Sequence, residues 1–326
     1  MTQEQTQAYN QSQARTEAKS REYAIDARNI VKRFGDVTAL SNFSLQVETG
    51  TIFGLIGPNG AGKTTFMRTL LDFLRPTSGE VSVLGHNVRT ASATLRTQIG
   101  YLPGELRLDP NVSGHSLINY WAGLSKHPRQ ARKYARSLAK EFDIDLKRRV
   151  GTLSKGNKQK IGIIQAFMHS PELLILDEPT SGLDPVLQQN FLNLVLRANR
   201  DGATVLLSSH ILSELEHIAD RAAVMYKGRL VREATIAQLR ESTRRHLSAR
   251  LMGAEIGNVR IALASAGLKV AASPAEDSVM IEGDVEGQAN QIIHALSQFD
   301  VRDLLISEPS LEESVLHFYE AQEARK

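Results

Sequence analysis

Residues 57–64 read Gly57-Pro58-Asn59-Gly60-Ala61-Gly62-Lys63-Thr64, and they join an apolar run at 51–56 to a segment with helical spacing. A glycine-rich loop lets several backbone N–H groups point at one anion. Lys63 adds a positive charge for the β- and γ-phosphates of a nucleotide, and Thr64 offers a hydroxyl to Mg²⁺. The helix that follows directs its N-terminus at the same phosphates. The stretch therefore predicts a phosphate site on a strand-loop-helix unit, against the alternative of a structural glycine turn.

Composition limits what else the 326 residues can be. A hydrophobic content of 41% is ample for a core, and the length suits one large domain with a smaller one. The net charge of +3 is too small for a nucleic-acid-binding stripe, so no nucleic-acid partner is expected. The chain has no cysteine, which excludes disulfides and thiol nucleophiles. No apolar run reaches about 18 residues and no signal-peptide core is present, so we expect a protein of the cytoplasmic side.

The pattern divides the chain into a tail and two domains. Residues 1–22 are polar and rich in glutamine, which predicts a disordered tail. The first domain is expected over 23–235. It opens with alternating residues at 24–31 and 45–48, which indicate antiparallel strands.

Continuous apolar runs in the same domain indicate a parallel sheet. Residues 173–176 and 203–207 are apolar throughout, as strands buried on both faces are, and both follow helical segments. Residues 222–226 and 229–231 flank Lys227-Gly228 and predict a hairpin. Apolar residues at helical spacing predict that the helix after the phosphate loop continues until Pro76; they are Phe66, Leu70, Leu71 and Leu74.

A helical subdomain is predicted over about residues 105–160. One helix within it is expected to bury Tyr134, Leu138 and Phe142. Its other face is strongly basic, which is typical of a solvated helix surface and also compatible with a partner contact. The bases are Lys126, Arg129, Arg132, Lys133, Arg136 and Lys140.

The pattern restarts from about residue 236, and a second domain is expected over 236–326. Strands alternate with helices there in the order β-α-β-β-α-β, which predicts a ferredoxin-like α+β domain. The expected elements are strands at 247–251, 268–272, 278–282 and 301–306 and helices at 255–266 and 287–299.

Two carboxylates end the apolar run at 173–176. The carboxyl end of a buried parallel strand is where ligands bind in α/β sheets. We expect Asp177 to hold Mg²⁺ beside Thr64, mainly through water, and Glu178 to polarise a water for attack on the γ-phosphate. The alternative is an acidic pair on the surface.

Two further segments give weaker signals on their own. Ser154 and Gly156 stand just before a helix and could form a second anion site, or Ser154 could be a plain N-cap. His210 follows the strand at 203–207 directly and could reach a phosphate, or it could be a structural histidine. The other histidines show no metal-ligand spacing.

Together these motifs resemble the nucleotide-binding subunit of an ATP-binding cassette (ABC) transporter over about residues 24–235. The resemblance implies a P-loop ATPase domain of α/β class, with an antiparallel β subdomain and a helical subdomain. Residues 57–64, with Thr65, are similar to the Walker A loop, 153–157 to the signature and 173–178 to Walker B. Residues 181–184, with Asp184 in the nucleotide site, resemble the D-loop. His210 resembles the switch histidine, and Phe34 stands where the family stacks an aromatic ring on adenine.

The chain departs from the family at two places. A glutamine usually follows Tyr-Leu-Pro, contacts Mg²⁺ and senses the membrane partner, but Gly104 and Glu105 follow Pro103 here. Either Glu105 replaces it or the coupling differs. Lys155 and Asn157 are changed in the signature, while the phosphate-facing Ser154 and Gly156 remain.

The resemblance implies an ATPase that uses ATP and Mg²⁺ and lies at the inner face of the cell membrane. Two subunits, identical or related, would sandwich two ATP molecules and drive a separate membrane-spanning permease. The Ser-Lys-Gly-Asn signature is similar to the branch that exports drugs, antibiotics or polysaccharides. The alternatives are a soluble ABC mechanoenzyme, a regulatory module without ATPase activity and a small-molecule P-loop kinase.

Overall fold

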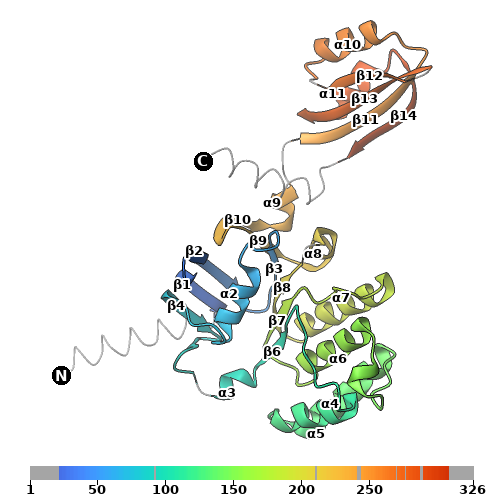
Figure 1. Ribbon diagram of the computed structural model, residues 1–326. Coiled ribbons are helices and arrows are strands. Elements are labelled where there is room, and N and C mark those ends of the chain that lie inside the picture. The colour runs from blue at the N-terminus through green and yellow to red at the C-terminus, as the bar shows by residue number, and fades with distance from the viewer. Residues whose placement is uncertain are drawn as a thin grey trace, which may run out of the picture. The chain divides into compact units, whose positions relative to one another are not determined.

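The computed structural model describes residues 22–91, 93–209, 211–240, 244–268, 270–275, 277–286 and 289–307. The chain divides into two compact units, Met1–Ile236 and Ala237–Lys326 (Figure 1). The tail predicted over 1–22 falls outside the described residues except for its last position. No helix within the described ranges is long and apolar enough to cross a bilayer.

A six-stranded sheet forms the centre of the first unit, in the order β10-β9-β3-β8-β7-β6. Neighbours from β9 to β6 are parallel, as the apolar runs predicted, and β10 pairs antiparallel with β9. Every residue of β3, β7 and β8 is buried. Lys227 and Gly228 both have positive φ and close the predicted β9–β10 hairpin. The strands are β3 (Ile52–Ile56), β6 (Ile99–Leu102), β7 (Leu173–Asp177), β8 (Thr204–Ser208), β9 (Arg221–Tyr226) and β10 (Arg229–Thr235).

The same unit contains a second sheet, which is antiparallel and has the strand order β2-β1-β4-β5. The two predicted strands are longer than expected, and the two short ones were not predicted. The rings of Phe43 on β2 and Phe66 on α2 lie 4.7 Å apart, so one apolar core joins this sheet to the helix after the phosphate loop. The elements are β1 (Tyr23–Phe34), β2 (Val37–Glu48), β4 (Ser78–Val83), β5 (His86–Asn87) and α2 (Lys63–Leu70).

Helix α2 ends earlier than the sequence pattern predicted. It stops at Leu70, and Asp72 has a φ of 54°, a left-handed conformation that cannot continue a helix. Leu70 and Leu71, which come just before that turn, are buried. The predicted continuation of the helix through Leu74 was therefore wrong, because the chain leaves the helix in a tight turn after Leu71.

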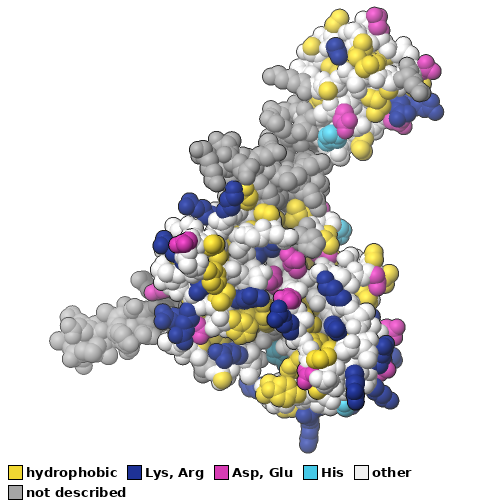
Figure 2. All heavy atoms as spheres, in the orientation of Figure 1, with side chains coloured by type: hydrophobic (Ala, Val, Ile, Leu, Met, Phe, Trp, Pro, Cys, Tyr) yellow, Lys and Arg dark blue, Asp and Glu magenta, His cyan; other side chains and the backbone are white. Residues whose placement is uncertain are grey.

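A group of helices occupies residues 114–167. The predicted basic helix, α5, buries Leu138 and Phe142 completely and Tyr134 by half. Arg197 of α7 donates two hydrogen bonds of 2.9 Å to Glu141 and ties α5 to α7. Figure 2 shows Lys and Arg side chains standing out from the part of the unit that α4 and α5 form. The remaining helices of this unit are α3 (Ala93–Arg96), α4 (Gly114–Leu124), α5 (Pro128–Glu141), the 3-10 turn η1 (Val150–Thr152), α6 (Lys155–Phe167), α7 (Pro185–Arg200) and α8 (Leu212–Ile218), followed by α9 (Ile236–Arg240) at the boundary.

The second unit has the predicted β-α-β-β-α-β order. Its sheet runs β12-β13-β11-β14 with every pair antiparallel, which is the ferredoxin-like arrangement. The strand predicted at 268–272 lies three residues later, because Leu268 is buried in the connection after α10 instead. The elements are β11 (Arg244–Met252), α10 (Ile256–Ser265), β12 (Ala271–Ala275), β13 (Ser278–Glu286), α11 (Ala289–Leu296) and β14 (Asp300–Ser307).

Candidate functional site

The loop at 57–64 has the backbone that a phosphate cradle needs. Gly60 and Gly62 have φ of 80° and 107°, a region that other residues rarely adopt. A side chain on Gly57 would place its Cβ 2.8 Å from the carbonyl oxygen of Met225. Gly62 is the N-cap of α2 and makes no side-chain cap, so the N–H groups of the first turn stay available for an anion.

The backbone requirement at Gly62 leads to a stability prediction. Gly62→Ala should lower the free energy of unfolding by about 2 kcal/mol or more, because a side chain is strained at this φ and its Cβ would lie 2.7 Å from the carbonyl oxygen of Ala39. Chemical denaturation measures the change. Gly123→Ala in α4 is the matched control, since nothing lies within 4 Å of the added Cβ, and it should be neutral or stabilising by up to about 1 kcal/mol. Equal losses in the two variants would contradict the backbone argument.

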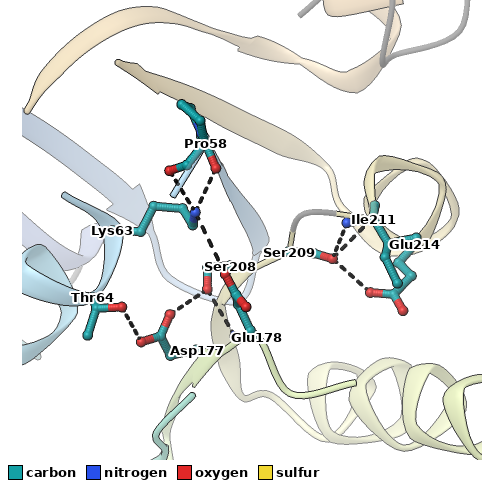
Figure 3. A network of polar contacts seen from close by, with 10 residues as sticks. Pro58, Lys63, Thr64, Asp177, Glu178, Ser208, Ser209, Ile211 and Glu214 are labelled. Carbon is teal, nitrogen blue, oxygen red and sulfur yellow. Dashed lines mark hydrogen bonds and ion pairs between the residues drawn. The ribbon is translucent and has the colours of Figure 1, made fainter. Parts of the chain in front are cut away.

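Lys63 is buried inside the loop, with 5% of its surface exposed. Its Nζ donates to the carbonyl oxygens of Gly57 at 2.6 Å and Pro58 at 3.4 Å, and it lies 3.8 Å from Glu178 Oε1 (Figure 3). Burial lowers the pKa of Lys63, and the nearby carboxylates of Glu178 and Asp177 partly offset that effect. The ammonium is thus poorly solvated and held inside the loop, where a phosphate would supply a stronger partner.

Asp177 and Thr64 meet at the end of β7. Thr64 Oγ1 donates to Asp177 Oδ2 at 2.7 Å, and Ser208 Oγ donates to Asp177 Oδ1 at 2.7 Å (Figure 3). The contact arises because β3, β8 and β7 are successive parallel strands, whose carboxyl ends meet at one edge of the sheet. A carboxylate beside a hydroxyl is an oxygen donor set of the kind that Mg²⁺ prefers. The described ranges contain no group of three or more His, Cys, Asp or Glu that could cage a metal alone, so water and phosphate would complete the coordination.

Glu178 has an unusual backbone for a residue other than glycine, with φ of 47°. Its N–H donates to Ser208 Oγ at 3.0 Å, and its side chain remains partly exposed beside Lys63. A left-handed non-glycine residue is costly and persists only where its surroundings hold it. The conformation turns the carboxylate toward the space in front of Lys63.

Three of the predicted site residues form a separate group. Ser154 is exposed and caps α6 by accepting from Asn157 N at 3.3 Å, and Asp184 caps α7 by accepting from Leu187 N at 3.0 Å. Gly156 lies against the D-loop, since a Cβ there would be 3.0 Å from Gly182 O. Among the described residues, no hydrogen bond or ion pair joins Ser154 to the loop at 57–64. Each chain therefore presents a phosphate loop and a signature segment as two distinct surfaces.

Phe34 and His210 complete the predicted set. The Phe34 ring is 47% exposed at the end of β1, with Lys32 Nζ 4.9 Å from the ring centroid. An exposed aromatic ring with a cation above it is a ready platform for a flat base. His210 lies outside the described residues, so its predicted role stays a prediction.

Gly104 lies against the carboxylate site, and Glu105 does not take the place of a side chain there. A Cβ on Gly104 would lie 3.3 Å from Asp177 O and 3.6 Å from Asp177 Oδ2. Glu105 is instead largely exposed, and its carboxylate accepts from Arg107 at 3.1 Å. A side chain at position 104 would therefore lie beside Asp177, and glycine places none there.

Sequence reasoning missed Ser208, whose hydroxyl connects Asp177 to the backbone of Glu178. The signal was present, because Ser208 follows the apolar run at 203–207 as Asp177 follows the run at 173–176. Only the strand order, with β7 beside β8, reveals that the two residues are neighbours: Asp177 and Ser208 are paired in register.

This chain is similar to known ABC transporter proteins. A family model described as "ABC transporter" matches residues 40–181. The bacitracin transport ATP-binding protein BcrA of Enterococcus faecalis is 38% identical over 231 residues, which cover 69% of this chain and 73% of that protein. The daunorubicin resistance ATP-binding protein DrrA3 of Streptomyces coeruleorubidus is 33% identical over 302 residues, which cover 90% of this chain and 95% of that protein.

Solved structures agree with this result. The structure described as the ATP binding subunit of an ABC transporter is 28% identical, with a TM-score of 0.63, over 67% of this chain and 92% of that one. The dimeric structure of the bacterial ABC transporter cassette MJ0796 is 23% identical, with a TM-score of 0.60, over 65% of this chain and 98% of that one. The second likeness shows a shared fold.

Proposed function

This chain belongs to the ABC transporter family as an ATP-binding subunit, and we propose from that premise that it hydrolyses ATP to power a separate permease exporting a drug, an antibiotic or a polysaccharide. The similarity to DrrA3, a daunorubicin resistance protein, carries this proposal because it extends through 90% of the chain. Two other relatives support the same proposal: BcrA is named as a bacitracin transport protein, and LnrL of Bacillus subtilis as a linearmycin resistance protein.

The site residues have distinct roles in this proposal. Backbone N–H groups of residues 57–62, with Lys63, Thr64 and Thr65, hold the phosphates of ATP, and Phe34 stacks on adenine. Thr64 and Asp177 hold Mg²⁺, which when bound neutralises charge on the phosphate oxygens. Glu178 accepts a proton from the water that attacks the γ-phosphate.

Each active site needs two subunits, because Ser154, Gly156 and Asp184 lie on a surface separate from the phosphate loop. ATP bound to one subunit would be covered by the signature of the second, identical or related. His210 would contact the γ-phosphate at that interface. ATP then favours the closed dimer by contacts that exist only there, and loss of the γ-phosphate reopens it. A shift from 1:99 to 99:1 requires about 5.5 kcal/mol of differential binding.

An arginine at the signature position tests this division of the site. Ser154→Arg should reduce ATP turnover at least about 100-fold while single subunits still bind ATP, because the new side chain blocks only the shared face. Phosphate release and fluorescent-nucleotide binding measure the two properties. Ser113→Arg is the matched control, since Ser113 caps α4 in the same way and should lose similar stability without loss of turnover. Wild-type turnover in Ser154→Arg would contradict the shared site.

A groove in the first unit is the candidate surface for the permease. It has a volume of about 340 Å³ and is lined mostly by apolar side chains, with Arg96 and Arg107 among them. Phe73 lines it beside Tyr101, with the ring centroids 5.8 Å apart, and is still 60% exposed, so it adds apolar surface that a partner could cover. The groove includes Pro103, next to Gly104, so an apolar segment of a permease seated there would adjoin the nucleotide site. The subunit would then lie on the cytoplasmic face of the membrane as a peripheral protein.

Co-purification tests the proposal. The protein would be tagged, native membranes solubilised in mild detergent, and stoichiometric partners identified. We expect an integral membrane protein, and its loss from a Phe73→Ser variant that retains ATP binding. Recovery in the soluble fraction with no membrane partner would favour the alternative, a soluble ABC mechanoenzyme.

A further inference from the structure

Glu214 on α8 is a buried carboxylate behind the nucleotide site, with 6% of its surface exposed. Its Oε2 accepts two hydrogen bonds, from Thr180 Oγ1 at 3.0 Å and from Ser209 Oγ at 2.8 Å (Figure 3). Its Oε1 has no hydrogen-bond partner among the described residues. A buried carboxylate that is only partly satisfied is expensive for stability, so a reason other than stability is needed for it.

The two hydroxyls belong to the two loops that carry the site. Thr180 comes two residues after Glu178, and Ser209 comes directly after Ser208. Ser208 in turn holds Asp177 and the N–H of Glu178. The ends of β7 and β8 are therefore joined twice. Ser208 joins them beside Asp177, and Glu214 joins the residues that follow them, Thr180 and Ser209.

Other contacts fix the same loop. Thr180 O accepts from Leu183 N at 3.0 Å, Glu178 O accepts from Ser181 N at 3.2 Å, and Gln159 of α6 donates to Pro179 O at 2.8 Å. Within this set, Glu214 supplies the acceptor that links the loop after Glu178 to the loop after β8. The left-handed backbone of Glu178 needs such support from both sides, because a strained residue keeps its conformation only when its neighbours over-determine it.

We propose that Glu214 is a positioning residue for hydrolysis: by holding Thr180 and Ser209 on one oxygen, it fixes the loops that aim Glu178 at the attacking water. The inference rests on the proposed ATPase function and adds to it. Among the described residues the Glu214 carboxylate bonds to Thr180 and Ser209 and not to the loop at 57–64, so its loss should change the rate of the chemical step and leave nucleotide binding intact. A misplacement of about 1 Å in a reacting group can cost on the order of 100-fold in rate.

Two substitutions separate positioning from packing. Glu214→Leu has no acceptor for either hydroxyl, and its kcat should fall about 10- to 100-fold, with KM and the ATP dissociation constant within about twofold of wild type. Glu214→Gln keeps a carbonyl oxygen that can accept both bonds, and it should retain kcat within about threefold. Glu216→Gln, two residues along the same helix, is the matched control and should turn over normally.

A double-mutant cycle tests the path through Thr180. Thr180→Val removes one arm and Ser209→Ala the other, and each should lower kcat with KM unchanged. Combined with Glu214→Leu, Thr180→Val should add no further loss, because the bond it removes is already absent. Ser209→Ala is tested only as a single variant, because Ser209 Oγ also bonds the backbone N and O of Ile211. These two variants leave Glu214 in place, so they test the proposal even if Glu214→Leu does not fold.

The outcomes are distinct. Wild-type protein that neither binds nor hydrolyses ATP would defeat the proposed function itself. Wild-type protein that hydrolyses ATP, with a folded Glu214→Leu variant at the same rate, would overturn the positioning role. Glu214→Gln as slow as Glu214→Leu would also overturn it, because the acceptor geometry would then not be what matters. Normal kcat in both Thr180→Val and Ser209→Ala would do the same.

Discussion

Glu178→Gln is expected to lose ATP turnover by about 10²- to 10⁴-fold, keep its affinity for ATP and accumulate as a dimer with Mg-ATP. The amide has the shape of the carboxylate but cannot accept the proton of the attacking water. Glu178 N–H is held by Ser208 Oγ, a bond that the substitution leaves unchanged, so the loop should keep its conformation. Without hydrolysis, the contacts that favour the closed state persist, and the dimer should not reopen.

Three measurements check this expectation. Phosphate release gives turnover, a fluorescent ATP analogue gives affinity, and light scattering with Mg-ATP gives the oligomeric state. Glu172→Gln is the control, because Glu172 is an exposed acid just before the same strand, β7, and should behave as wild type. Hydrolysis by Glu178→Gln at a rate near that of wild type would remove Glu178 from the role of base.

The arrangement of the candidate phosphate site could be predicted from sequence because each of its parts follows a buried apolar run. Residues 57–64 follow β3, and Asp177 and Glu178 end or follow β7, so the rule that ligands bind at the carboxyl ends of parallel strands was enough to bring them together. The contact between Thr64 and Asp177, which are 113 positions apart, follows from that rule.

The supports of the site could not be predicted in the same way. Ser208 and Glu214 act through hydrogen bonds whose geometry depends on strand order, on register and on the turn into α8. Periodicity alone does not distinguish Glu214 from Glu216, the other acid on the same short helix. Similarly, spacing could not reveal that α2 ends at Leu70, because buried leucines in a turn and in a helix give the same pattern. The replacement of a glutamine by Gly104 and Glu105 was visible, but only the structure shows Glu105 paired with Arg107.

Lys63→Ala should abolish ATP binding at the concentrations that saturate wild-type protein. A hydrogen bond to a charged group contributes about 1.5–3 kcal/mol, and Lys63 would make such bonds to more than one phosphate oxygen in a water-poor site. The apo protein should behave differently. Because burial lowers the pKa of Lys63, the folded state holds the protonated ammonium at a cost. Removing it should leave the free energy of unfolding within about 1 kcal/mol of wild type.

The two halves of this prediction are read in one thermal-shift series. Wild-type protein should gain stability with ATP by mass action, whereas Lys63→Ala should melt near the wild-type apo temperature and gain nothing. Lys160→Ala removes another largely buried lysine, on α6, and should keep the full ATP response. A normal ATP shift in Lys63→Ala would contradict the phosphate role of the loop. A large loss of stability without nucleotide would instead show that Lys63 stabilises the loop through its bonds to Gly57 and Pro58. Only such a structural role would make its removal destabilise the protein in the absence of ATP.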